Sequence, residues 1–119
     1  DMTYRGPRSD HSMILAMSGK DPLIELIVPL EGPSIYHEFR ERVGTGLHHL
    51  GYYVEDLDAT TQAMADAGYA MVQSGRATGA HGTGAYAYYD TFEELGYFLE
   101  AVVPPLARRP PHRVWPEES

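Results

Sequence analysis

The sequence predicts an α+β fold made of paired βαβββ units, whose strands form a curved mixed sheet with an open cleft. The first observation is an internal repeat, because residues 23–29 (LIELIVP) recur at a constant offset as residues 98–104 (FLEAVVP). The second is the order of hydrophobic patterns over residues 46–104, which is strand, helix, strand, strand, strand. The third is size, since 119 residues with 43% hydrophobic content suit one compact domain.

Residues 1–45 are predicted to hold the last three strands of a first unit, followed by a connecting helix. The strands are expected at residues 2–5, 12–17 and 23–28, because each is a largely apolar run bounded by polar, Gly or Pro residues. The helix is expected over residues 33–43, where apolar side chains recur at helical spacing before a glycine ends the pattern.

Residues 46–104 are predicted to form a complete second unit. Its opening strand is expected over residues 46–54. Glu55 and the Asp that follows it suit the positive N-terminal end of a helix that runs to about Ala67. A glycine after this helix is a suitable C-cap, and the next strand is expected over residues 69–73.

The rest of the second unit is predicted to be a Gly-rich loop and two strands. The loop covers residues 74–84 and lacks the Gly-Lys-Ser/Thr signature of a phosphate-binding loop. The strands are expected at residues 85–89 and 96–103, with a polar turn at residues 90–94 between them. Residues 105–119, which are rich in Pro and Arg, are predicted to form an irregular tail.

The first unit is expected to lack its opening strand and helix in this chain. When the opening strand of the second unit is moved back by the offset of the repeat, it falls before Asp1. We expect these two elements to be missing from the sequence in hand rather than supplied by a partner chain.

The composition excludes several classes of function. The chain has 9 Lys and Arg against 17 Asp and Glu, a net charge of −8 that would be repelled by nucleic acids and anionic membranes. No apolar run approaches the roughly 20 residues of a membrane-spanning helix. The chain has no Cys, which excludes disulfides, zinc–cysteine sites and thiol catalysis. No secretory signal is visible, so a cytoplasmic protein is expected.

Glu25 and Glu100 are the first candidates for a functional site. Each lies within an apolar strand, where a carboxylate is costly to bury unless its charge is compensated. They occupy equivalent positions in the repeat, and His48 and His49 lie on the opening strand of the second unit. One His and one Glu from each of two facing units would suit a divalent ion such as zinc, cobalt, nickel, manganese or iron. Since side chains alternate along a strand, the two histidines should point to opposite faces, and the pattern does not choose between them.

Residues 46–57 (GLHHLGYYVEDL) resemble the opening of the second half of vicinal oxygen chelate proteins, the glyoxalase, bleomycin resistance and dioxygenase superfamily. Within it they are most similar to methylmalonyl-CoA epimerase and its relatives. The similarity extends over residues 24–30, 34–39, 79–82 and 98–100. This resemblance implies a fold of paired βαβββ units and a homodimer without nucleic-acid or membrane partners.

The resemblance also implies the residues of the site. By position, Glu25, His49 and Glu100 would bind the metal, and a His on the absent strand would be the fourth ligand. In the wider group, which includes glyoxalase I, such carboxylates also move protons, so Glu100 and its counterpart Glu25 are the candidate catalytic residues. The predicted function is therefore that of a metal-dependent epimerase, isomerase or lyase, which transfers a proton next to a carbonyl or thioester while the metal stabilises an enolate.

Two alternatives remain open. The first is a binding protein of the same fold, like the bleomycin resistance proteins, which sequesters an aromatic small molecule without chemistry. The second is an extradiol-type dioxygenase with iron bound by two His and one carboxylate. For a small-molecule ligand of either an enzyme or a binding protein, the candidate contact residues are Tyr53, His81 and Tyr88.

Overall fold

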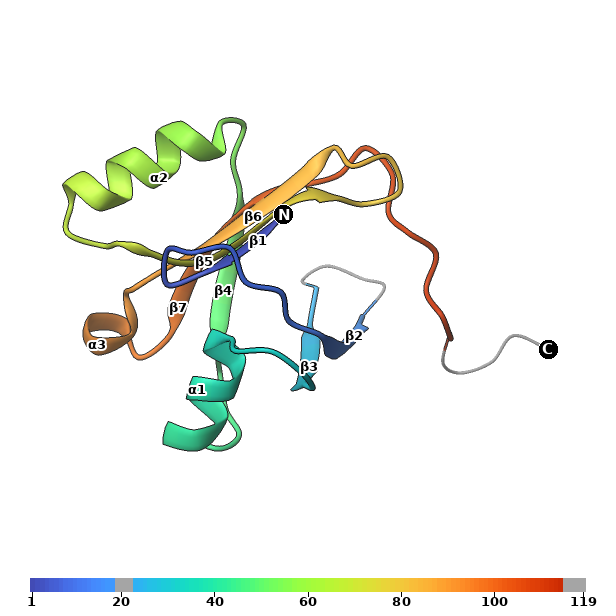
Figure 1. The fold of residues 1–119 in the computed structure, drawn as a ribbon, viewed down its shortest axis with the longest axis horizontal. Helices are drawn as coiled ribbons and strands as arrows, with labels where there is room; N and C mark the ends of the chain where they lie inside the picture. Colours follow the sequence, from blue (N-terminus) through green and yellow to red (C-terminus); the bar gives the residue numbers. More distant parts are fainter. Residues whose placement is uncertain (19–22, 115–119) are drawn as a thin grey trace.

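The computed structural model describes residues 1–18 and 23–114. It has the predicted mixed α+β architecture, with three helices and two β-sheets (Figure 1). The tail predicted at residues 105–119 has no helix or strand as far as residue 114, and its last five residues lie outside the described part. None of the helices in the described part is long and apolar enough to cross a lipid bilayer.

The larger sheet has five strands in the order β1-β5-β6-β7-β4. β4 and β7 run parallel, and the other neighbours are antiparallel. The parallel pair needs a crossover connection, which begins with α2 after β4. The elements are β1 (Met2–Tyr4), β4 (His49–Tyr53), α2 (Leu57–Asp66), β5 (Met71–Thr78), β6 (Gly84–Tyr89) and β7 (Phe98–Val103).

The smaller sheet is an antiparallel hairpin of β2 (Met13–Met17) and β3 (Glu25–Pro29). The prediction that residues 2–5 belong with this hairpin differs from the structure, because β1 pairs with β5 of the larger sheet. The chain turns away after β1 through Arg5 and Gly6, which both have positive φ, and the Thr3 hydroxyl hydrogen-bonds the Ser74 hydroxyl of β5. The three predicted strands therefore lie in two sheets.

The two longer helices lie on opposite sides of the larger sheet (Figure 1). α1 (Ile35–Arg42) begins at Ser34, whose hydroxyl accepts a hydrogen bond from the His37 amide. β6 contributes side chains to both faces of the sheet, because successive side chains of a strand point to opposite faces. Two buried clusters result. On the α1 side they are Ile35, Tyr36, Val72, Tyr88 and Phe98, and on the α2 side Leu57, Ala87, Tyr89 and Ala101.

Two predicted loops are more ordered than expected. β5 continues to Thr78, where a Gly-rich loop is predicted from residue 74 onward. These residues pair with β6, and Gly75 lies opposite Tyr86, whose ring occupies the space that a Cβ at position 75 would need. The predicted polar turn before β7 contains a short helix, α3 (Phe92–Leu95), which ends at Gly96 with a φ of 80°.

Candidate functional site

The site is centred on His49, whose imidazole lies between two carboxylates. Its Nε2 is 3.4 Å from Oε2 of Glu25 and 3.5 Å from Oε1 of Glu100. His49 begins β4, Glu100 lies in the neighbouring strand β7, and Glu25 begins β3 of the hairpin. The three residues therefore come from three strands and two sheets, and they meet where the hairpin approaches the larger sheet. We call them the His49 cluster.

Gly51 provides the space for the Glu100 carboxylate. The register of the parallel pair places Gly51 opposite Glu100, two residues beyond His49 and on the same face of β4. A Cβ at position 51 would lie 2.9 Å from Oε1 of Glu100, closer than side-chain atoms normally approach. Sequence reasoning missed this residue, although a glycine inside a strand is a recognised signal of close approach.

We expect Gly51→Ala to displace the Glu100 carboxylate from His49 and to weaken divalent-ion binding by about tenfold or more. Isothermal titration calorimetry with Zn²⁺ measures the effect. Gly46→Ala is the matched control, because a Cβ there would meet Phe39 and Val43 only at ordinary contact distances of 3.6 and 3.8 Å. Equal affinities for the two variants would show that position 51 does not shape the cluster.

Burial sets the electrostatics of Glu100, whose side chain is only 11% exposed. It raises the pKa of Glu100 to about 7; His49 opposes this shift, Glu25 adds to it and the Tyr88 hydroxyl lowers it slightly. Tyr88 is itself buried, and its hydroxyl is 2.8 Å from that of Tyr36 on α1. A carboxyl group with this pKa can both accept and release a proton near neutral pH.

His48 lies beside His49 but among the side chains that pack under α1. Its Nδ1 is 2.9 Å from Nδ1 of His49, so the prediction that the two rings face opposite sides of a strand is wrong. The alternation begins only with β4, which starts at His49. Burial lowers the pKa of His48 to about 3; His49 adds to this shift and the backbone of Ile35 opposes it. His48 is therefore neutral at ordinary pH.

The donor atoms of the His49 cluster suit a divalent ion. One imidazole nitrogen and two carboxylates are common ligands of the first-row metals. Two ligands that are each about 2.1 Å from a tetrahedral ion are about 3.4 Å apart, close to both separations from His49 Nε2. As the side chains stand, however, no three His, Asp or Glu of the described residues are gathered closely enough to hold an ion. The two distances from His49 Nε2 are those expected between ligands of one ion, but the three side chains are not all close enough together to bind an ion at the same time.

The three predicted ligand-contact residues lie in different surroundings. Tyr88 is buried, and its ring centroid is 5.1 Å from that of His49, so its ring packs against the imidazole of the cluster. Tyr53 is 64% exposed at the opposite end of β4 from His49. His81 is exposed in the turn between β5 and β6. The structure therefore brings only Tyr88 to the His49 cluster.

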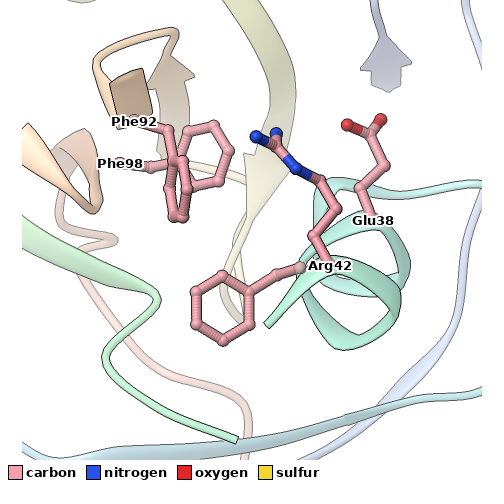
Figure 2. A pocket seen from close by; sticks show the side chains of 5 residues that line it. Glu38, Arg42, Phe92 and Phe98 are labelled. Atoms are coloured by element: carbon pink, nitrogen blue, oxygen red, sulfur yellow. The ribbon is translucent and has the colours of Figure 1, made fainter. Parts of the chain in front are cut away.

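Two concave features of the surface lie away from the cluster. A crevice of about 10 Å³, enough for one water molecule, lies between α1 and the aromatic rings of Phe92 and Phe98 (Figure 2). The guanidinium carbon of Arg42 is 5.1 Å from the centre of the Phe92 ring there. An open groove of about 450 Å³ lies beside the start of α2, where Arg76 pairs with Asp58. Neither feature is lined by the His49 cluster.

Comparison with known proteins places the chain among related sequences. A protein-family model described as "Glyoxalase/Bleomycin resistance protein/Dioxygenase superfamily" matches residues 1–88. The chain is 32% identical over 81 residues to "Uncharacterized protein YqjC" of Bacillus subtilis (strain 168). The aligned region covers 68% of this chain and 57% of that protein, so the chain spans little more than half the length of this relative.

Proposed function

The chain belongs to the Glyoxalase/Bleomycin resistance protein/Dioxygenase superfamily, and we propose that it is part of a metal-dependent epimerase or isomerase. The reaction is proton transfer at the carbon next to a carbonyl or thioester of a small molecule. The observation that carries this proposal is the position of His49 between Glu25 and Glu100. The family model matches residues 1–88, which include Glu25 and His49. Glu100 lies beyond this match and is assigned because it occupies the same position as Glu25 in the repeated strand.

Glu25, His49 and Glu100 are the proposed ligands of a divalent ion, with zinc, cobalt, nickel, manganese and iron as the candidates. When bound, such an ion supplies positive charge that stabilises negative charge on a substrate oxygen. The room that Gly51 leaves beside Oε1 of Glu100 supports this assignment, because it gives the carboxylate a defined position on the face of the sheet that carries His49.

Glu100 is the proposed base that removes the substrate proton, and Glu25 is the proposed group that returns a proton from the other side. Glu100 reaches the cluster from the larger sheet, whereas Glu25 reaches it from the hairpin. Removing a proton from one side of a carbon and returning it on the other requires two groups that approach from different directions. The side chain of Glu25 is 29% exposed and that of Glu100 11%, so Glu25 is also the more accessible of the two to solvent.

We further propose that the β2–β3 hairpin belongs to the first of two βαβββ units, and that the protein is a homodimer. Glu25 pairs with Met17 across the hairpin in the way that Glu100 pairs with Tyr88 between β6 and β7. This equivalence supports the two-unit arrangement. Several large apolar side chains of the hairpin are exposed, and such surface commonly lies at an interface. These side chains are Ile14, Leu15, Met17, Leu26 and Val28.

Metal analysis and proton exchange test the proposal together. The full-length protein is loaded with each of the five ions, dialysed and analysed for bound metal. Exchange of the proton next to a thioester carbonyl is then followed in D₂O by NMR. We expect His49→Ala to lose bound metal and exchange activity, because it removes the imidazole that lies within 3.5 Å of both carboxylates. His112→Ala, at an exposed site in the tail, is the matched control and should retain both.

A wild-type protein that retains none of the five ions would contradict the metal site and favour the sequestering alternative. Retained metal without exchange of any thioester or carbonyl substrate would contradict the proposed reaction.

A further inference from the structure

The segment after β7 carries an arginine to the hairpin that holds Glu25. This segment, residues 104–109, which we call the docked tail, passes the turn between β5 and β6 and then reaches β2 (Figure 1). Nη1 of Arg108 is 3.6 Å from Sδ of Met17, the last residue of β2. Met17 lies directly opposite Glu25 in the hairpin. Directly opposed side chains of an antiparallel pair point to the same face, so the Arg108 guanidinium lies on the Glu25 side of the hairpin.

Hydrogen bonds on both sides of Arg108 hold the docked tail against the turn between β5 and β6. The carbonyl of Ala107 accepts a hydrogen bond from the Ala80 amide at 2.8 Å. Nε of Arg109 donates to the carbonyl of Gly79 at 3.3 Å. Arg108 is therefore held through both of its neighbours, which presents its side chain to the hairpin.

Two glycines of the turn between β5 and β6 make this close approach possible. A Cβ at Gly79, which has a φ of 85°, would lie 2.3 Å from Cβ of Pro105 and 2.7 Å from the carbonyl oxygen of Ala107. A Cβ at Gly84 would lie 3.0 Å from Pro105. Side chains at these two positions would push the docked tail away, so part of the glycine-rich sequence is explained by the packing of the tail.

The charge of Arg108 is not neutralised by a carboxylate of the described residues, although the chain has a net charge of −8. Its polar contact is the thioether of Met17, which is a weak acceptor. Its guanidinium therefore keeps the paired N–H donors that match a carboxylate or a phosphate. Other arginines of the described part do form ion pairs with carboxylates, and these are Arg5, Arg8, Arg42 and Arg76.

We propose that Arg108 binds an anionic group of the substrate, a carboxylate or a phosphate, while the reacting carbon lies at Glu25 and Glu100. This inference rests on the proposed function and adds the substrate class, a small carbonyl compound that carries a negative charge. The pairing of Met17 with Glu25 supports it, because it places the guanidinium and a proposed proton-transfer group on one face of the hairpin. An acidic chain repels anions, so a substrate of this class needs the positive charge that the docked tail provides.

Titration of the chelator-treated full-length protein, followed by ¹H–¹⁵N NMR, tests the inference without requiring turnover. Removing metal ensures that the anion is not bound by an ion instead. The probes are levulinate with its methyl ester, and dihydroxyacetone phosphate with dihydroxyacetone, so that each anion has a neutral carbonyl counterpart. We expect the Nε–Hε signal of Arg108 and the amide signal of Met17 to shift with at least one anion and with neither neutral compound. The two pairs distinguish a carboxylate from a phosphate.

Arg108→Gln should weaken binding of that anion by about tenfold or more, because the charge-assisted hydrogen bonds are lost. Arg40→Gln removes the same charge at an exposed position of α1 and is the matched control. Gly79→Ala should also weaken binding, because the new side chain displaces the docked tail. Its matched control is Gly82→Ala, which has a positive φ as well but meets Ala77 at an ordinary distance of 3.7 Å.

Equal affinity for the anion and its neutral counterpart in both pairs would overturn the inference. So would an anion affinity that Arg108→Gln leaves unchanged, or that Arg40→Gln lowers to the same extent. Failure of the proposed function is distinguishable from these results. A protein that binds the anion through Arg108 but neither retains a metal nor exchanges a proton would contradict the proposed reaction and leave the anion site standing.

Discussion

Glu100→Gln is expected to make the protein more stable at pH 8 and at the same time nearly inactive. Burial raises the pKa of Glu100 from 4.5 to about 7, so the folded state holds a proton that the unfolded state releases between these pH values. Stability from this group is present below pH 4.5 and is lost as pH rises to 7, about 3 kcal/mol in all. The neutral Gln avoids this cost, but it can neither bind a metal as an anion nor accept a proton. Loss of a general base commonly lowers turnover by about 100- to 10,000-fold.

Urea unfolding of wild type and Glu100→Gln, in the presence of a chelator, measures the stability change at pH 4 and pH 8. The two proteins should differ little at pH 4, and the variant should be the more stable at pH 8. Glu41→Gln, at an exposed position of α1, is the matched control for loss of one carboxylate. A stability difference that is the same at both pH values would contradict the burial of a charge at Glu100, and full turnover would contradict its role as base.

Acid is expected to destabilise the protein through His48. Burial holds the pKa of His48 at about 3, against 6.5 for an ordinary histidine. The unfolded chain therefore binds a proton near pH 6.5 that the folded protein excludes until about pH 3. Stability falls by about 5 kcal/mol as pH decreases through this range, which is a large fraction of the stability of a small domain.

The effect of His48 is best measured in the Glu100→Gln background, since Glu100 acts in the opposite direction between pH 7 and 4.5. Urea unfolding at pH 7, 5.5 and 4 should show a marked loss of stability with acid when His48 is present. The loss should be much smaller when His48 is replaced by Phe. Parallel pH profiles for the two proteins would show that His48 is not a source of acid sensitivity.

The residues of the His49 cluster differed in how far they could be predicted from the sequence. Glu25 and Glu100 could be selected because a charged residue recurs at one position of a repeated apolar strand. The choice of His49 over His48 came from a family resemblance, since the pattern of the strand left both open. Gly51 was missed because its role depends on the register of β4 against β7, which brings Glu100 beside it.

The α+β class, the order of most strands and helices, and the two carboxylates worth testing could be predicted from the amino-acid sequence alone. These follow from local signals: apolar periodicity, helix caps and a repeat whose copies can be compared directly. Three features became visible only in the folded protein: β1 pairs with β5, the hairpin approaches the larger sheet at His49, and the imidazoles of His48 and His49 are in contact. These contacts join residues far apart in the chain or depend on how a ring is enclosed, so they arise from long-range strand pairing and side-chain packing, which local sequence patterns do not encode.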